Sequence, residues 1–358
     1  MTSNEKDIQI PVKDVEIEDI DIEKIHNEIY KEAKNAYVEE NPTKVYSHVD
    51  GVDFAISIDE AKEIINEDKE EYVIPLEITV PEVTIDDIAE QVFPEKLSSF
   101  TTRYDANNEN RTNNILLAIE KIDGTILFPG ETFSYNKTVG ERTIKNGYKE
   151  ATVYSGGKVV QGIGGGICQV STTLYNAVLY ANLDIEKRSN HKFLVSYAEP
   201  GRDATVSWGI TDFCFSNSRN YPIRINCNAV NGLLRVDIYG LKEEEEYEVK
   251  LETNILEETN FKTNYINDST IDEGTEEIQQ YGKKGIVCET YKVLKLNGKV
   301  VSKEILSTDT YNSLEQIVKK GTKEVEKTSA EPETENNNKT NTSFFPIVQD
   351  DGYIIRND

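Results

Sequence analysis

The order of apolar and polar positions divides the chain into three regions that predict packed elements, followed by a polar tail. Residues 1–98 predict a small α/β module, residues 99–241 a mixed α/β domain, and residues 242–324 a small β-rich module. Residues 325–358 are expected to form a flexible linker and C-terminal tail, because 325–344 consist largely of Glu, Asn, Thr and Ser. The predicted fold class is therefore α+β, arranged in several domains.

The first region should hold two helices and two strands. Helical spacing and strand alternation predict, in this order, a helix, a strand, a helix and a strand over residues 20–36, 52–58, 60–66 and 72–80. Ser57 or Asp59 could cap the second helix, and Pro75 suggests an edge or a break in the second strand.

A glycine-rich stretch followed by a helix organises the central region. Four glycines lie within residues 162–166, and the apolar positions that follow share one helical face, at Val170, Leu174, Val178 and Ala181. Ser171 and the two threonines after it would lie in the first turn, where hydroxyl groups can satisfy free backbone amides. Cys168 is therefore predicted at the N-terminal end of a helix, with a glycine loop before it.

A second helix and a hairpin are also expected in this region. Asn110 or Thr112 could cap a helix that Gly124 ends and whose apolar stripe is Ile115, Ile119 and Ile122. Asn231-Gly232 is a strong signal for a two-residue hairpin turn.

The third region indicates an all-β module. Its pattern predicts short strands between residues 249 and 322, separated by Gly282–Gly285 and by Asn297-Gly298. The tail segments Phe344–Val348 and Tyr353–Ile355 could dock on a domain, at a place that the pattern does not give.

Charge changes the picture by excluding classes of partner. The chain has 39 Lys and Arg against 65 Asp and Glu, a net charge of −26. We expect no nucleic-acid partner, because no excess of positive charge can neutralise phosphates, and no docking on anionic lipid. No stretch reaches the ~20 apolar residues of a membrane span, and residues 1–20 do not resemble a signal peptide. Alone, these features predict a cytoplasmic protein.

The cysteines and histidines predict neither a metal site nor a cofactor. The four cysteines, Cys168, Cys214, Cys227 and Cys288, lack metal-ligand spacing, and the chain has only three histidines. Cys214 and Cys227 lie in apolar strand patterns and are interpreted as packing residues, with a disulfide between them left open. The glycine stretch lacks the Gly-Lys-Ser/Thr ending of a phosphate-binding loop.

Cys168 is the candidate nucleophile. A thiolate at a helix N-terminus is stabilised by exposed amides and the helix dipole, which can lower its pKa below the ordinary ~8.5. Amides near Gly165, Gly166 and Cys168 could also stabilise a tetrahedral oxyanion. His191 is the one histidine of the central region and is the preferred base. The alternative is that Cys168 is a small, buried, unreactive packing residue.

Several motifs resemble the VanW domain family. They follow one another in order within residues 99–241: Phe128–Asn136, Val139–Thr143, Gly147-Tyr148, Gly164–Ala177, Asp203–Val206 and Phe213–Asn217. The resemblance implies a cell-wall protein of Gram-positive bacteria. Some family members are L,D-transpeptidases that cross-link peptidoglycan stem peptides through a cysteine, which here would be Cys168. It also implies the extracellular face of the membrane, with an anchor that would lie outside this sequence.

The flanking regions carry weaker resemblances. Residues 1–98 resemble the peptidoglycan-binding-like modules that precede VanW domains. Residues 242–324 loosely resemble glycine-marked, wall-associated modules, for which glycan binding and a passive spacer role both stay open.

Asp203 and Asp212 are both candidates for the group that orients His191. If residues 190–197 and 204–209 form a hairpin, simple pairing places Asp212 closer to His191, and Asp203 on the order of 20 Å away. The family pattern instead draws attention to Asp203. Both alternatives remain open at this point.

Arg142, Gln169 and Ser171 complete the predicted substrate and oxyanion set. Arg142 could hold a substrate carboxylate through two hydrogen bonds, or pair with Glu141 or Glu150. Gln169 and Ser171 follow Cys168 in the first turn of its helix.

The predicted function is peptidoglycan L,D-transpeptidation, with stem peptides as donor and acceptor and a link between third residues. Two alternatives are a wall-peptide hydrolase of the L,D-carboxypeptidase or endopeptidase type and a non-catalytic wall-binding protein. Water access and the reactivity of Cys168 separate the three.

Overall fold

The chain folds into two compact units, residues 1–94 and residues 95–358. The computed structural model describes residues 2–4, 7–11, 20–40, 43–65, 71–155, 158–323 and 352–354. The expected flexible stretch 325–344 and the segment Phe344–Val348 lie outside these residues. No helix in the described part is long and apolar enough to cross a membrane.

The N-terminal unit is a four-stranded sheet with two main helices. Its elements are β1 (Thr2–Asn4), β2 (Asp7–Pro11), α1 (Ile22–Ile29), β3 (Tyr37–Glu39), β4 (Lys44–Tyr46), β5 (Gly51–Phe54), α2 (Ile58–Ile65), β6 (Glu71–Thr79) and α3 (Ala89–Val92). The strand order is β1-β2-β6-β5, and a separate pair is formed by β3 and β4. Isoleucines of both helices pack with Phe54, Tyr72 and Ile74 in one core.

Three sequence expectations for this unit can be compared with the structure. The helix expected over 20–36 ends at Ile29, because Lys31 and Lys34 make bridges to the β5 region instead of continuing the helix. Of the two cap candidates, Ser57 caps α2. Its Oγ accepts from Glu60 N–H at 3.2 Å, and the Glu60 carboxylate accepts from Ser57 N–H at 2.9 Å. Pro75 lies where β6 changes its partner from β2 to β5.

The second unit contains an antiparallel sheet that supports the cysteine-bearing helix. Its first part comprises β7 (Glu95–Tyr104), α4 (Glu109–Ile122), β8 (Ile126–Leu127), β9 (Thr132–Ser134), α5 (Tyr135–Val139), β10 (Glu150–Ser155), β11 (Lys158–Ile163), α6 (Ile167–Tyr180), β12 (Asp184–Lys187), β13 (Cys214–Ser216), β14 (Ile223–Val230) and β15 (Leu233–Gly240). The main sheet has the order β22-β7-β15-β14-β8, where β22 is Gly352–Ile354. The tail thus pairs with the β7 edge.

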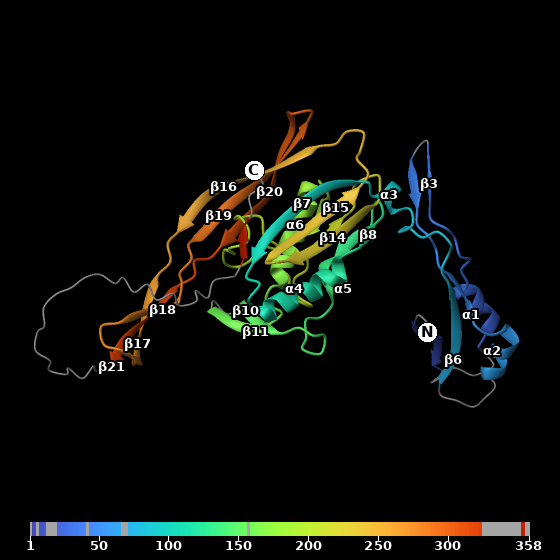
Figure 1. The fold of residues 1–358 in the computed structure, drawn as a ribbon, viewed down its shortest axis with the longest axis horizontal. Coiled ribbons are helices and arrows are strands. Elements are labelled where there is room, and N and C mark those ends of the chain that lie inside the picture. The colour runs from blue at the N-terminus through green and yellow to red at the C-terminus, as the bar shows by residue number, and fades with distance from the viewer. Residues whose placement is uncertain are drawn as a thin grey trace, which may run out of the picture. The chain divides into compact units, whose positions relative to one another are not determined.

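One face of this sheet is buried under two helices. Alternate residues of β7 and β15, such as Phe100, Leu234 and Val236, point into the core. Helix α6 packs against β7 and β15, and α4 packs against β14 and α6 (Figure 1). The predicted stripe of α6 is buried, but so is nearly every other position of the helix, including Ser171.

Two cap and turn predictions have different outcomes. Asn108, and neither Asn110 nor Thr112, caps α4, because its side chain accepts from Arg111 N–H at 3.1 Å. Asn231 and Gly232 have φ values of 52° and 77° and join β14 to β15, as a two-residue hairpin turn requires.

The hairpin predicted over residues 190–209 is wrong. The described residues 188–206 contain no helix or strand, although Arg202 N–H donates to Glu199 O at 3.1 Å and closes the expected turn. Polar side chains, described below, satisfy the backbone of this segment instead of a strand partner.

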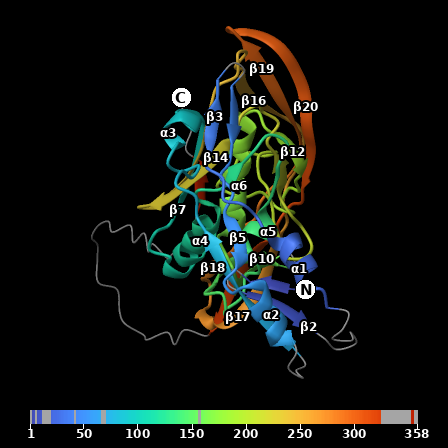
Figure 2. The same ribbon diagram turned by 90° about the vertical axis from the view of Figure 1, so that its right-hand side faces the viewer.

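The C-terminal part of the second unit consists of two three-stranded sheets. Its strands are β16 (Glu248–Thr259), β17 (Thr263–Asp272), β18 (Glu276–Gln280), β19 (Gly285–Leu296), β20 (Lys299–Tyr311) and β21 (Gln316–Lys323). The orders are β16-β19-β20 and β17-β21-β18. Several strands are long, up to 13 residues, where short ones were expected. Figures 1 and 2 show β16, β19 and β20 beside α6.

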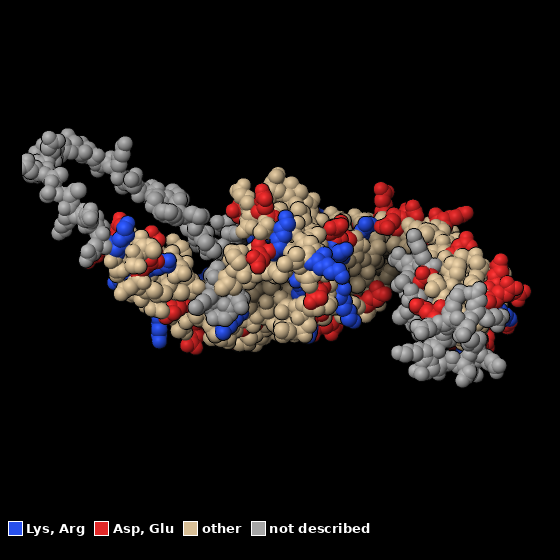
Figure 3. Space-filling model, turned by 90° about the horizontal axis from the view of Figure 1, so that it is seen from below, with Lys and Arg blue, Asp and Glu red and all other residues tan. Residues whose placement is uncertain are grey.

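The surface carries charges of both signs, and the cysteines do not form disulfides among the described residues. Acidic and basic side chains are intermixed over the middle of the face seen in Figure 3. All four cysteines are free thiols, so Cys214 and Cys227 do not pair.

Candidate active site

The glycine loop places Cys168 in the first turn of α6. Gly166 is the N-cap residue and has a φ of 107°, a left-handed conformation that glycine adopts without steric cost. Gly165 passes so close to β10 that a Cβ would lie 2.7 Å from Thr152 O. The sequence is therefore glycine-rich here because both the turn and the close approach exclude side chains.

The loop leaves backbone amides free around the thiol. Ile167 N–H donates to Gly164 O at 3.2 Å, and Gln169 N–H donates to Gly166 O at 3.1 Å. Within the described part of the chain, the amides of Gly165, Gly166 and Cys168 have no acceptor. Unpaired amides at a helix N-terminus are the donors that an oxyanion requires.

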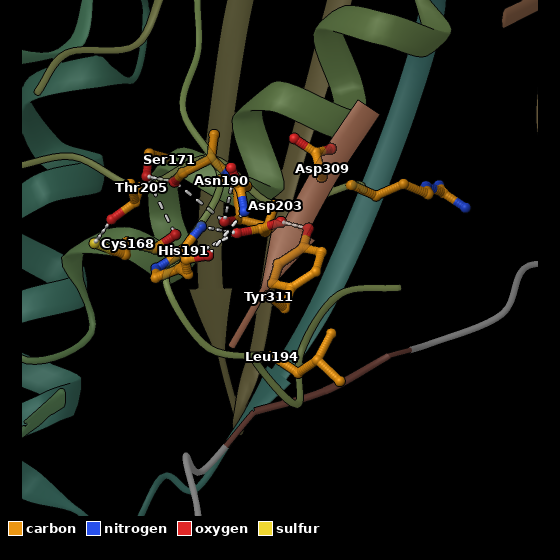
Figure 4. Close-up of polar contacts among 12 residues, drawn as sticks. Cys168, Ser171, Asn190, His191, Leu194, Asp203, Thr205, Asp309 and Tyr311 are labelled. Carbon is orange, nitrogen blue, oxygen red and sulfur yellow. Dashed lines mark hydrogen bonds and ion pairs between the residues drawn. The ribbon is translucent and has the colours of Figure 1, made fainter. Parts of the chain in front are cut away.

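The Cys168 thiol lies beside the imidazole of His191, and both groups line one cavity (Figure 4). Its sulfur also lies 3.5 Å from Val206 O and 3.6 Å from Thr205 Oγ1. Burial raises the pKa of the thiol, but His191, with smaller effects of Val206 and Thr205, outweighs burial and lowers the pKa to about 7. A large fraction of thiolate is therefore present at neutral pH.

Asp203 orients His191 from the opposite side. The imidazole Nδ1 lies 2.5 Å from Asp203 Oδ2, and the backbone N–H of His191 donates to the same oxygen at 2.7 Å. The second ring nitrogen, Nε2, is left for the thiol and lies 3.4 Å from the hydroxyl of Tyr197. Burial lowers the pKa of His191, but Asp203 and the thiol together raise it to about 10. The site thus favours a thiolate–imidazolium pair.

Asp203 is itself almost completely buried and is held by two further side chains, Arg188 and Tyr311. The Arg188 guanidinium contacts Oδ1 at 3.2 Å, and its Nε donates to the Asp203 backbone carbonyl at 2.6 Å. The hydroxyl of Tyr311, on β20, donates to Oδ1 as well. Burial raises the pKa of this carboxyl, but these donors and His191 lower it below its ordinary value.

A cavity of about 580 Å³ opens beside the sulfur. Its lining includes Cys168, His191, Arg142 and Trp208, and the Arg142 guanidinium lies 5.9 Å from the centre of the Trp208 ring. Arg142 donates to Asn136 Oδ1 and Gly140 O, both at 2.8 Å, and not to Glu141 or Glu150 among the described contacts. The cavity therefore presents a cation next to an aromatic surface.

The structure brings some predicted residues together and places others elsewhere. Cys168, His191 and Asp203 form one connected group, whereas Asp212 accepts from Ser134 Oγ at 2.6 Å and from Asn136 N–H at 2.9 Å. Asp212 thus stabilises the start of α5. The pairing that favoured it fails because residues 190–209 do not form a hairpin.

Gln169 and Ser171 have their polar atoms engaged inside the protein. Gln169 donates to Thr102 Oγ1 at 3.0 Å and accepts from Arg111 at 2.8 Å. Ser171 Oγ donates to Ala204 O at 2.7 Å, so it does not satisfy a helix amide as expected. Both residues fasten α6 to its neighbours, and Gln169 also lines the cavity beside Cys168.

Sequence reasoning missed the groups that surround Asp203. Arg188 and Tyr311 lie 15 and 108 positions from Asp203 along the chain. Neither stands in a motif, so a single sequence contains no signal for them.

Two family models match separate parts of the chain. Residues 110–239 match the family model described as VanW like protein, and residues 250–323 match the G5 domain. The chain thus contains a VanW-like domain followed by a G5 domain.

Two curated proteins and one solved structure are similar to parts of the chain. The "Uncharacterized protein YoaR" of Bacillus subtilis (strain 168) is 42% identical over 171 residues, which are 46% of this chain and 56% of that protein. The "Vancomycin B-type resistance protein VanW" of Enterococcus faecalis (strain ATCC 700802 / V583) is 33% identical over 123 residues, 33% of this chain and 44% of that protein. The chain therefore spans about half the length of these relatives. The structure titled "IgA1 Protease G5 domain structure" is 32% identical, covering 24% of this chain and 99% of its own, with a TM-score of 0.16.

Proposed function

We propose that this protein is a cysteine acyltransferase, an L,D-transpeptidase that cross-links peptidoglycan stem peptides at the cell surface. The observation that carries the proposal is the connected group Cys168–His191–Asp203 beside free amides and a cavity. A thiol, a base and an orienting carboxylate in this order are what acyl transfer through a thioester requires. In this proposal the N-terminal unit binds the wall.

The first half of the reaction forms the acyl-enzyme. The Cys168 thiolate attacks the carbonyl carbon of the third residue of a tetrapeptide stem, and the amides of Gly166 and Cys168 stabilise the oxyanion. The bond to the terminal D-alanine then breaks, and the His191 imidazolium gives its proton to the departing amine. A thioester to Cys168 and a neutral imidazole remain.

The second half transfers the acyl group. The side-chain amine of a diamino acid on another stem attacks the thioester, and His191 takes the proton that this amine loses. The carbon–sulfur bond breaks and the thiolate–imidazolium pair returns. The product is a link between third residues. The acceptor must occupy the cavity ahead of water, because water in the same place would give hydrolysis.

Arg142 supports recognition of an anionic stem. Its guanidinium lines the cavity and is held by Asn136 and Gly140 without a carboxylate partner among the described residues. A carboxylate of the donor or acceptor stem can therefore pair with it.

The test is incubation of the protein with disaccharide-tetrapeptides, followed by mass spectrometry of the products. We expect cross-linked dimers that disappear in Cys168→Ala. Trimmed monomers without dimers would identify a hydrolase. Unchanged substrate, together with a Cys168 thiol inert to alkylation, would leave a non-catalytic wall-binding protein.

A further inference from the structure

The loop that carries His191 and Asp203 is held by the G5 domain. Residues 188–203 contain no helix or strand in the described structure, so contacts with other elements set their conformation. Asn190 Nδ2 donates to Thr310 O at 3.0 Å, and Asn312 N–H donates to Lys192 O at 2.8 Å. The end of β20 thus binds the residues on both sides of His191.

Two side chains of β20 support the carboxylate that orients the imidazole, Tyr311 directly and Asp309 through Arg188 (Figure 4). Asp309 and Tyr311 are two positions apart and point to the same face of the strand, and both are buried. Asp309 accepts from Arg188 Nη1 with both oxygens, at 2.6 and 2.7 Å, and Arg188 in turn contacts Asp203. Tyr311 donates to Asp203 directly.

Each carboxylate oxygen of Asp203 has its own set of hydrogen-bond donors. Oδ1 accepts from Tyr311 and Arg188, and Oδ2 accepts from the ring and the backbone of His191. The Tyr311 oxygen also accepts from Gly201 N–H at 2.8 Å, which fixes the direction of its hydroxyl proton toward Asp203. With Oδ1 occupied, the carboxylate has one orientation, and that orientation directs Oδ2 to the imidazole.

We infer that Tyr311 and Asp309 of the G5 domain are positioning residues of the VanW-like active site, so that the thiol is fully activated only when the G5 domain is docked. The inference rests on the proposed cysteine chemistry. It makes the G5 domain part of the catalytic arrangement, in addition to any wall binding. Neither residue lines the cavity, so both act through Asp203 and His191.

A matched control separates positioning from simple adhesion between domains. Thr253, on β16, donates to Pro200 O at 3.1 Å and thereby joins the G5 domain to the same loop. It contacts neither Asp203 nor His191. Thr253→Val and Tyr311→Phe therefore each remove a hydroxyl that crosses this interface, and only Tyr311→Phe changes the support of Asp203.

The experiment measures the rate at which iodoacetamide alkylates Cys168 in the full chain at a series of pH values. Mass spectrometry of the Cys168 peptide gives the alkylated fraction. We expect Tyr311→Phe to raise the titration midpoint of the thiol and to slow alkylation at pH 7 by about tenfold, the scale of one hydrogen bond to a charged group. Thr253→Val should keep the wild-type midpoint. A folded Tyr311→Phe protein with an unchanged midpoint would overturn the inference, as would an equal shift in Thr253→Val.

A second variant covers the case in which Tyr311→Phe does not fold. In Asp309→Asn, Arg188 pairs with Asp203 alone and draws the Asp203 carboxylate away from His191. We therefore expect the titration midpoint of the thiol to rise, but by less than in Tyr311→Phe. An unchanged midpoint in folded Asp309→Asn would then refute the inference.

This titration needs no wall substrate and so separates the inference from the proposed function. If the wild-type thiol has a low titration midpoint but the protein forms neither dimers nor trimmed stems, the proposed transpeptidase is refuted and the positioning role of Tyr311 and Asp309 is supported. A wild-type midpoint at the ordinary ~8.5 would overturn the positioning itself.

Discussion

Replacing His191 by glutamine should deactivate the Cys168 thiol. Burial raises the pKa of the thiol, and the imidazole is the main group that opposes burial, with smaller effects of Val206 and Thr205, so that the pKa falls from 9.0 to about 7. That shift corresponds to about 3 kcal/mol of thiolate stabilisation. Because burial remains in His191→Gln, the pKa should return to at least the ordinary value, and the thiolate fraction at pH 7 should fall from about a half to a few per cent.

The assay is the rate of carboxyamidomethylation of Cys168 at several pH values. We expect His191→Gln to react at least about tenfold more slowly at pH 7 and to approach the wild-type rate at high pH, where both thiols are ionised. His48→Gln, which changes a histidine of the N-terminal unit, is the matched control and should behave as wild type. Equal titration midpoints for His191→Gln and wild type would refute the thiolate–imidazolium pair.

Three further predictions concern pH, stability and substrate binding. Activity should rise as pH passes through about 7, where the thiolate forms, and fall as pH passes through about 10, where the His191 imidazolium loses its proton; an initial rate that stays constant through neutral pH would contradict this. Leu174→Ala, at a fully buried position of α6, should lower the free energy of unfolding in chemical denaturation by about 2–5 kcal/mol, whereas Leu116→Ala, at a 44% exposed position, should change it by about 0.5 kcal/mol or less; equal losses would count against the assigned core. Arg142→Gln should raise the KM for stems with free carboxylates more than for their amidated forms, and an equal effect on both would argue against carboxylate recognition.

The parts of the site that a local pattern encodes were predictable from the sequence. The glycine run, the apolar stripe of α6 and the Asn231-Gly232 turn each depend on residues a few positions apart, and all three occur in the structure. The position of Cys168 in the first turn follows from the first two. Local backbone sterics and helical periodicity decide these features, so a single sequence contains them.

The segment that carries His191 and Asp203 was not predictable in the same way. Its apolar alternation indicates a hairpin, but the side chains of Asn176, Thr253 and Lys283, from distant elements, donate to its backbone carbonyl groups. Tertiary contacts therefore override the strand preference of residues 190–209. This override is also the reason why the pairing argument favoured Asp212, and why Tyr311 could not be anticipated.

The hydroxyl-rich first turn of α6 shows a related limit. Ser171, Thr172 and Thr173 look like capping residues, yet they bond carbonyl groups of α6 and of residue 204. The helix is buried nearly all round, so its polar side chains must find partners inside the protein. Their bonding leaves the amides of Gly166 and Cys168 free, and those are the amides that the proposed mechanism uses.

The most direct test of the central claim is the mass of the protein itself during reaction. We would mix the full chain with a tetrapeptide stem that lacks an acceptor amine, stop the reaction with acid and map the modified peptide. The account predicts a tripeptide acyl group on the Cys168 peptide of the wild type and none on Cys168→Ala. Release of D-alanine by Cys168→Ala at the wild-type rate, or an acyl group on another residue, would contradict it.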